Sequence, residues 1–365
     1  MTSEISLRVL NRTLLDRQFL LSRDPRPALG VIERLVALQS QEPNWPYVAL
    51  WARVGDFRID ELMWLLMSKQ VVRAAGLRRT QHLMASSDLR WLRPTIQPVL
   101  DRGAQSRYFT SETSGLGIDE LTAVGVNLLG RDTLSRRELA RQLEEKWPGR
   151  KGRVLAAALE LHVPLVHSPG TSAWGAWGSP ARVEVARAET VIGPLSGRAQ
   201  PEMLIRRYLG AFGPATVMDF QSWSGLTKVG EIFEAMRPSL RAYRTDEGVE
   251  LFDVPDATLA DGDLPVPVRF LPGYDNVLLG HAIRTRIVSD EDRKQVMPGG
   301  AVVRPTFLVD GFVGGIWSLQ RSTVFVMPFR PLSDEARSEV ATESERLLEF
   351  LAPDNPFGEV SIAGL

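Results

Sequence analysis

Two glutamines separated by one residue, Gln39 and Gln41, lie just before Pro43 and Trp45. A neutral amide does not remove a proton at physiological pH, but its oxygen accepts hydrogen bonds and its NH2 group donates them. Two such groups that face each other can hold a water molecule in a fixed position. The alternative is a structural role, in which the amides cap a helix end or join two helices by hydrogen bonds.

The residues before this pair predict that it ends a helix. Apolar residues recur at helical spacing after residues 24–27, and Pro43 disfavours helical backbone in the preceding residue, so we expect the helix to end near Glu42. Residues two apart do not share a face of a helix, so the two amides can converge only where the helix loosens. The next helix is expected over residues 47–53, with Pro46 at its first position.

Helices followed by two-stranded ribbons recur along the chain, which is the pattern of three tandem winged helix-turn-helix units. In the first unit, three helices precede strands expected over residues 71–77 and 80–85. In the second unit, helices are expected over 118–129, 135–144 and 153–162, and strands over 164–167 and 173–178. In the third unit, helices are expected over 201–212, 216–222 and 228–236, and strands over 240–244 and 249–253.

The C-terminal part of the chain follows a different pattern, that of a small β unit closed by a helix. Its strands are expected over 268–271, 302–309, 314–319 and 324–327, and its helix over 334–351. The predicted fold class is therefore α+β. The predicted boundaries are 1–110 for the first winged unit with the glutamine pair, 111–195 for the second, 196–262 for the third and 263–365 for the β unit.

The net charge of −1 conceals an uneven distribution of the 43 lysines and arginines. Seven arginines lie between positions 71 and 107 against two aspartates, and eight basic residues lie between 131 and 153 against four acidic ones. Seven acidic residues, in contrast, lie between 246 and 263. A basic first half fits a surface that follows phosphate groups, although solvated helix faces would give the same composition.

The composition also excludes several classes of protein. The chain has no cysteine, so a disulfide framework, a thiolate nucleophile and a cysteine zinc site are excluded. Its four histidines lack the spacing of metal ligands, and its glycines lack the phosphate-loop pattern, so we expect neither a metal nor a nucleotide cofactor. No apolar run is long enough to span a bilayer, and the N-terminus lacks a signal peptide. These absences predict a soluble cytoplasmic protein.

Several short motifs occur in an order that resembles the AlkZ-type winged-helix DNA glycosylases, relatives of the bacterial YcaQ proteins. The motifs are Gln39-x-Gln41 before the Pro-Tyr-x-Ala-Leu-Trp-Ala-Arg helix, Arg79-Thr80-x-His82-Leu83, Leu271-Pro-Gly-Tyr-Asp-Asn276 and the stretch 305–317. The resemblance covers nearly the whole chain. It implies excision of N7-alkylated guanines from double-stranded DNA, hence a nucleoid location. Several members protect actinomycetes from their own DNA-alkylating antibiotics, including bulky or crosslinking ones.

The resemblance also implies which residues form the site. Gln39 and Gln41 match the catalytic pair, Arg79 and His82 match recurrent positions on the first wing, and Asp275 matches the Tyr-Asp motif. For His82 the alternative is a structural hydrogen bond, and for Asp275 it is the cap of a turn.

Further candidate residues lie near these motifs. Trp45 is, with the Tyr-Asp motif, a candidate support of the site, and Arg206, Arg207 and Arg244 are candidate contacts to DNA backbone or minor groove. The family usually has an aliphatic residue between the two glutamines, whereas this chain has Ser40. That departure is compatible with a separate subfamily and with a non-catalytic relative.

An amide pair suits the removal of a cationic base. N7-alkylated guanine leaves as a neutral molecule and needs no general acid, while the sugar becomes oxocarbenium-like. Positioned water and amide oxygens then stabilise the transition state. The prediction is a monofunctional glycosylase that acts as a monomer, without a cofactor or a Schiff-base lysine. The alternative is a non-enzymatic winged-helix DNA-binding protein, either a regulator or a lesion-shielding factor.

Overall fold

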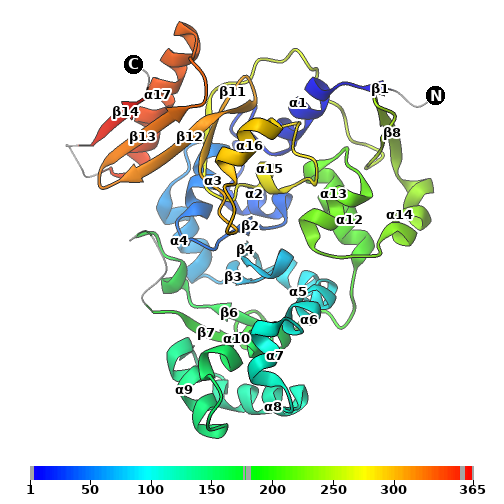
Figure 1. The fold of residues 1–365 in the computed structure, drawn as a ribbon, viewed down its shortest axis with the longest axis vertical. Helices are drawn as coiled ribbons and strands as arrows, with labels where there is room; N and C mark the ends of the chain where they lie inside the picture. Colours follow the sequence, from blue (N-terminus) through cyan, green and yellow to red (C-terminus); the bar gives the residue numbers. More distant parts are fainter. Residues whose placement is uncertain (1–3, 176, 178–181, 354–357, 364–365) are drawn as a thin grey trace.

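The computed structural model describes residues 4–175, 177, 182–353 and 358–363 (Figure 1). These residues form a mixed α+β fold with sheets of three, five and six strands, as the fold class predicted. No helix of the described residues is long and apolar enough to cross a membrane.

The N-terminal elements surround the glutamine pair. Ser6 caps the first helix by accepting a hydrogen bond from the backbone nitrogen of Val9. The helices are α1 (Leu7–Arg17), α2 (Ala28–Leu35), α3 (Trp45–Arg53), α4 (Ile59–Met67), α5 (Ser86–Thr95), α6 (Gln97–Ala104) and α7 (Arg107–Thr113). The strands are β1 (Glu4–Ile5), β2 (Leu38–Gln39), β3 (Val71–Ala75) and β4 (Gln81–Ala85), and the 3-10 helix η1 (Leu77–Arg79) joins the last two.

The middle of the chain contains two further groups of helices and strands. The second group, after the N-terminal one, is α8 (Ile118–Leu129), β5 (Leu134–Ser135), α9 (Arg136–Lys146), α10 (Gly152–His162), β6 (Leu165–His167), η2 (Pro169–Ser172), β7 (Glu184–Arg187) and α11 (Ala188–Ile192). The third group is α12 (Pro201–Phe212), α13 (Val217–Ser224), α14 (Gly230–Met236), η3 (Arg237–Ser239), β8 (Arg241–Thr245) and β9 (Glu250–Asp253).

The C-terminal part forms the five-stranded sheet, with α17 packed against it. Its strands are β10 (Arg269–Leu271), β11 (Thr306–Val309), β12 (Phe312–Gln320), β13 (Thr323–Pro328) and β14 (Glu359–Ile362). Its helices are α15 (Asn276–Leu279), α16 (Asp290–Val296) and α17 (Asp334–Leu351). The predicted β unit closed by a helix is therefore present, with β14 as a strand that the pattern did not predict.

The six-stranded sheet joins the first two groups of elements in the order β2-β4-β3-β6-β7-β5. Strand β3 pairs antiparallel with β6, so that Arg73 lies opposite His167. The two ribbons that the sequence assigns to separate units thus form one continuous sheet (Figure 1).

Hydrophobic packing groups the elements in a second way. Helices α8 to α10 have a core of their own, built from leucines such as Leu121, Leu143 and Leu159. Helices α2 to α4, helices α12 to α14 and the five-stranded sheet share a single larger core. The third group of elements is therefore packed on the first group and not beyond the second.

Two predicted elements are wrong. The helix expected to reach Glu42 ends at Leu35, because Val36 has a positive φ of 70° and the chain then pairs with β4. The strand expected over 173–178 is not a strand at residues 173–175 and 177, and positions 176 and 178 lie outside the described residues. The second strand of that ribbon is instead β7, which pairs with β6 and β5.

Candidate functional site

The glutamine pair lies at the edge of the six-stranded sheet. In the pairing of β2 with β4, Gln39 is opposite His82, and the backbone nitrogen of Ser40 donates to the oxygen of Gln81 at 2.8 Å. Residues that lie opposite each other in a pair of strands project to the same face, so Gln39 is on the His82 face of the sheet. Strand β2 ends at Gln39; the next residue, Ser40, is fully buried, whereas Gln41 lies in a bend and is exposed. The glutamine pair therefore lies at the end of a short strand and in the bend that follows it, and not at the loosened end of a helix.

The two glutamines differ in exposure. Gln39 is 9% exposed, and its Oε1 accepts a hydrogen bond of 3.2 Å from the Arg78 guanidinium. Burial lowers the pKa of Arg78 to about 10, so this side chain remains a cation at neutral pH. Gln41 is exposed, and its Oε1 lies 3.5 Å from the backbone nitrogen of Gln81. One amide is thus largely buried, and the other is open to solvent.

The Arg73 guanidinium holds the backbone of residues 40 and 41 by donating hydrogen bonds to both of their carbonyl oxygens. Its Nε donates to the Ser40 oxygen at 2.8 Å, and its Nη2 donates to the Gln41 oxygen at 3.3 Å. Its Nη1 lies 2.9 Å from Nδ1 of His167. Burial lowers the pKa of Arg73 to about 10, which still leaves the guanidinium charged at neutral pH.

A buried carboxylate completes this network. Glu160 accepts hydrogen bonds from Gln81 Nε2 at 2.8 Å and from Arg136 at 2.6 Å, and lies 3.4 Å from His167 Nε2. Burial would raise the pKa of Glu160, but the hydrogen bond from His167 and the charge of Arg136 lower it to about 2. Sequence reasoning missed Arg73, His167 and Glu160, because only the pairing of β3 with β6 brings them together.

His82 is buried, contrary to its predicted contact with DNA. It is 1% exposed on a strand that lies between β2 and β3, and its Nδ1 lies 2.9 Å from the Thr80 oxygen. Burial, with the nearby charge of Arg78, lowers the pKa of His82 to about 3. The ring is therefore neutral, and the structural alternative is the one that the geometry favours.

The remaining predicted arginines divide into two groups. Arg79, Arg206 and Arg244 are exposed, although Arg206 donates to Ser239 Oγ at 2.7 Å. Arg207 instead forms two hydrogen bonds to Asp88, at 2.8 and 3.0 Å. Its guanidinium also lies 5.7 Å from the ring centre of Trp91, so it joins α12 to α5, and its contact with DNA stays a prediction.

The predicted supports of the site have structural roles. Asp275 is buried, pairs with Arg53 at 2.7 and 2.9 Å, and caps α15 by accepting from the Val277 nitrogen. It therefore ties the end of α3 to the C-terminal part. Trp45, at the start of α3, makes edge contacts with Trp177 and Trp317 at centroid distances of 4.8 and 6.0 Å.

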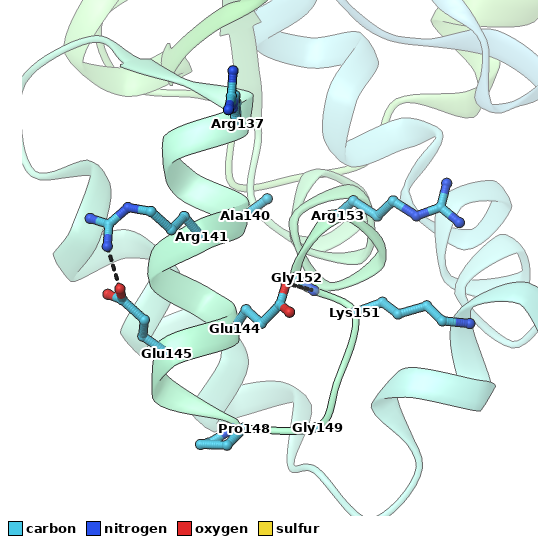
Figure 2. A pocket seen from close by; sticks show the side chains of 10 residues that line it. All are labelled: Arg137, Ala140, Arg141, Glu144, Glu145, Pro148, Gly149, Lys151, Gly152 and Arg153. Carbon is cyan, nitrogen blue, oxygen red and sulfur yellow. Dashed lines mark hydrogen bonds and ion pairs between the residues drawn. The ribbon is translucent and has the colours of Figure 1, made fainter.

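Two open grooves of about 730 and 760 Å3 lie beside α9 and α10. Figure 2 shows the first, with Arg137 near the start of α9 and Arg153 extending from the start of α10. Arg137 and Arg153 also line the second groove, together with Arg136, Arg182 and the half-exposed Tyr108. The excess of basic residues between positions 131 and 153 was the signal for this surface, although no single residue was predicted.

Comparisons with known proteins agree with this architecture. The model of the family described as DNA glycosylase AlkZ-like matches residues 32–350. A relative from Streptomyces sahachiroi, named interstrand DNA cross-link repair glycosylase, is 26% identical, and the match covers 86% of this chain and 88% of that protein. The solved structure of Streptomyces sahachiroi DNA glycosylase AlkZ has the same fold, with a TM-score of 0.79 and 22% identity over 98% of this chain and 99% of that one. The family match favours the enzyme over the non-enzymatic alternative: the chain belongs to the AlkZ-like family of DNA glycosylases.

Proposed function

We propose that the enzyme hydrolyses the N-glycosidic bond of N7-alkylguanine in double-stranded DNA, including bulky or crosslinking adducts formed by natural products. The observation that carries this proposal is that Gln39 and Gln41 lie together at the sheet edge, with Gln41 open to solvent. The Streptomyces sahachiroi relative is named for interstrand cross-link repair, which supports crosslinking adducts as substrates.

The two amides have complementary hydrogen-bonding roles. A guanidinium only donates, so the Gln39 atom beside Arg78 is the carbonyl oxygen, and the Gln39 NH2 group is left to donate elsewhere. The Gln41 oxygen has a long contact with the Gln81 nitrogen and retains a lone pair. A water molecule that accepts from Gln39 and donates to Gln41 keeps one lone pair for attack on the sugar.

The charge of the lesion explains why amides suffice for this reaction. N7 alkylation makes guanine cationic, so the base leaves as a neutral molecule without protonation by the enzyme. The sugar becomes oxocarbenium-like, and the attacking water bonds late. Under those conditions a fixed water and an oriented amide oxygen contribute more than a strong base would.

The basic surface supports DNA binding by the predicted winged units. We propose that residues 1–110, 111–195 and 196–262 each act as a winged helix-turn-helix unit, and that the enzyme acts as a monomer. The grooves beside α9 and α10 are lined by arginines such as Arg137 and Arg153, which suit a phosphate backbone. Arg79, Arg206 and Arg244 are exposed and remain candidate contacts.

The test is a base-release assay on duplexes that carry a small N7-methylguanine, a bulky N7-guanine adduct or an N7-guanine crosslink. Wild type should release all three, and Gln41→Ala should reduce the single-turnover rate roughly 100-fold because one preorganised group is lost. Gln105→Ala, an exposed glutamine after α6, is the matched control and should keep the rate.

The charge argument gives the assay a second arm. An uncharged lesion such as 8-oxoguanine would leave as an anion and needs a proton donor, so wild type should not release it. Release of 8-oxoguanine at the rate of N7-methylguanine would contradict the proposed chemistry. Equal rates for wild type and Gln41→Ala would remove Gln41 from the mechanism.

A further inference from the structure

A series of buried polar contacts, called the relay below, connects the second group of elements to the backbone of the glutamine segment, residues 39–41. It consists of Glu160, His167 and Arg73, all less than 7% exposed. Glu160 lies on α10 and His167 on β6, whereas Arg73 lies on β3 and holds the segment itself. We propose that these three side chains are positioning residues for the glutamine pair, an inference that rests on the proposed function.

The strand register places Arg73 and His167 on the face of the sheet opposite the Gln39 amide. Gln39 is opposite His82 on β4, whereas Arg73 is opposite Leu83, one residue along. Because successive residues project to opposite faces, Arg73 and His82 lie on different sides of the sheet. Arg73 therefore acts through the carbonyl oxygens of Ser40 and Gln41, and leaves the amide side chains free for the substrate.

The donors and acceptors along the relay determine which ring nitrogen of His167 carries the proton. A guanidinium has no acceptor, so Nδ1 of His167 must accept from Arg73 at 2.9 Å. The proton of the neutral ring is then on Nε2, which donates to Glu160 at 3.4 Å. Protonation of Nδ1 would place two donors face to face. All hydrogen bonds of the relay therefore run in one direction: Arg73 donates to His167, and His167 donates to Glu160.

Glu160 also holds a second contact to the segment. Its Oε1 accepts from the Gln81 side chain at 2.8 Å, and the backbone nitrogen of Gln81 lies 3.5 Å from the side-chain oxygen Oε1 of Gln41. The Gln81 oxygen also accepts from the Ser40 nitrogen. One carboxylate thus supports the pair by two routes, through His167 and Arg73 and through Gln81.

Arg136 lies at the end of the relay that is nearest to the protein surface. It donates to Glu160 Oε2 at 2.6 Å, and its half-buried side chain also lines the second basic groove. The surface that we propose for the DNA backbone and the segment that we propose for catalysis therefore share one carboxylate. A small displacement of this support moves the amides, and a misplacement near 1 Å can lower a rate about 100-fold.

The experiment compares Glu160→Gln and Arg73→Lys with matched variants in another buried ion cluster. Arg269 and Glu343 are also less than 7% exposed and lie 3.9 Å apart, and Arg269 donates to a backbone oxygen, that of Leu20. Single-turnover release of N7-methylguanine is measured together with the Kd for the same duplex. Both relay variants should lose roughly 10- to 100-fold in rate with Kd within about twofold, while Glu343→Gln and Arg269→Lys keep the rate.

A second measurement does not depend on activity. Hydrogen–deuterium exchange of the peptide that contains Ser40 and Gln41 should become faster in Glu160→Gln and Arg73→Lys and remain unchanged in the two controls. If Arg73→Lys does not fold, Glu160→Gln provides the same test, because it keeps the size of the side chain and removes only its charge.

The outcomes separate this proposal from the proposed function. Wild-type rates in folded relay variants would overturn the positioning role, as would equal losses of rate and Tm in relay and control variants. If wild type releases no alkylated base, the proposed function fails, while exchange at Ser40 still decides on the relay. Unchanged exchange would then overturn it, and faster exchange confined to the relay variants would support it.

Discussion

At the scale of single residues, Ser40 occupies a position with two opposite demands. Its backbone oxygen and nitrogen are both hydrogen-bonded, to Arg73 and to Gln81. Its hydroxyl is fully buried and has no hydrogen-bond partner among the residues that the structure describes. The backbone hydrogen bonds of Ser40 therefore stabilise the segment, whereas its buried hydroxyl, which makes no hydrogen bond, lowers the stability of the fold by about 1–3 kcal/mol.

Replacement of Ser40 by alanine should stabilise the protein. We expect the free energy of unfolding to rise by about 1 kcal/mol, because the unpaired hydroxyl is removed and the backbone bonds remain. Urea unfolding measures this difference, and the base-release rate should stay within about twofold of wild type.

Ser224→Ala is the control for that prediction. The Ser224 hydroxyl is equally buried but donates to the Phe220 oxygen at 2.7 Å and accepts from Leu226. Its removal should lower the free energy of unfolding by about 1 kcal/mol. A lower stability for Ser40→Ala would show that its hydroxyl has a partner after all.

At the scale of elements, the sequence predicts long helices well and short strands poorly. Helices α8, α12 and α17 begin and end where their apolar periodicity predicts. Strand β2 has only two residues, and its existence depends on β4, which is more than 40 residues further along the chain. A local pattern cannot contain that pairing, so the helix before it was predicted to be too long.

The same limit applies to the candidate site. The identity and spacing of Gln39 and Gln41 drew attention to the pair, but a structural role stayed open, and their catalytic role is a prediction from the family resemblance. The burial of His82 was not predictable, because it depends on β2 covering β4. The ion pair of Asp275 with Arg53 likewise joins residues more than 200 positions apart.

The contact between α9 and α10 gives a prediction at this scale. A Cβ atom at Gly152 would collide with the backbone oxygen of Ala140, which cannot move without moving α9. Gly152→Ala should therefore lower the free energy of unfolding by about 1–3 kcal/mol. Thermal unfolding measures the effect, and Gly170→Ala should be near neutral, since an added Cβ there meets no atom within 4 Å.

At the scale of the whole molecule, the basic grooves predict how binding depends on salt. Arg137→Ala and Arg153→Ala should each weaken binding to undamaged duplex DNA and reduce the slope of log K against log salt by about one unit. The reason is that each would remove one of the phosphate contacts that we propose for the groove in Figure 2. Fluorescence anisotropy at several salt concentrations measures both quantities.

Arg293→Ala provides the comparison for the salt series. Arg293 lies on α16 and is paired with Asp290 at 3.3 Å, outside both grooves. Its slope should equal that of wild type. An unchanged slope for both groove variants would place the DNA on another surface of the molecule.

The histidines predict an acid-sensitive fold. Burial lowers the pKa of His82 and of His281 to about 3, and it lowers the pKa of His162 and His167 as well. Between these values and the unfolded value near 6.5, the unfolded chain binds protons that the folded chain does not. Stability is therefore complete above about pH 6.5 and decreases as the pH falls, by up to about 1.4 kcal/mol per pH unit for each histidine.

Urea unfolding at pH 7.5 and 5.5 tests this dependence. This range lies above the usual pKa of the carboxylates, so the change reports mainly on the histidines. We expect a lower free energy of unfolding at pH 5.5, with proton uptake on unfolding. An equal or higher value at pH 5.5 would contradict the burial of these rings.

The pairing of β3 with β6 has a consequence for how a damaged duplex is accepted. Because backbone hydrogen bonds join these two groups of elements edge to edge, they cannot rotate apart and close around DNA without breaking the sheet. The relative position of these two groups of elements is then set before DNA binds, so any bending or unstacking would fall on the double helix itself. A lesion that has already weakened its own stacking would then be selected by its pliability, before any atom of the modified base is touched.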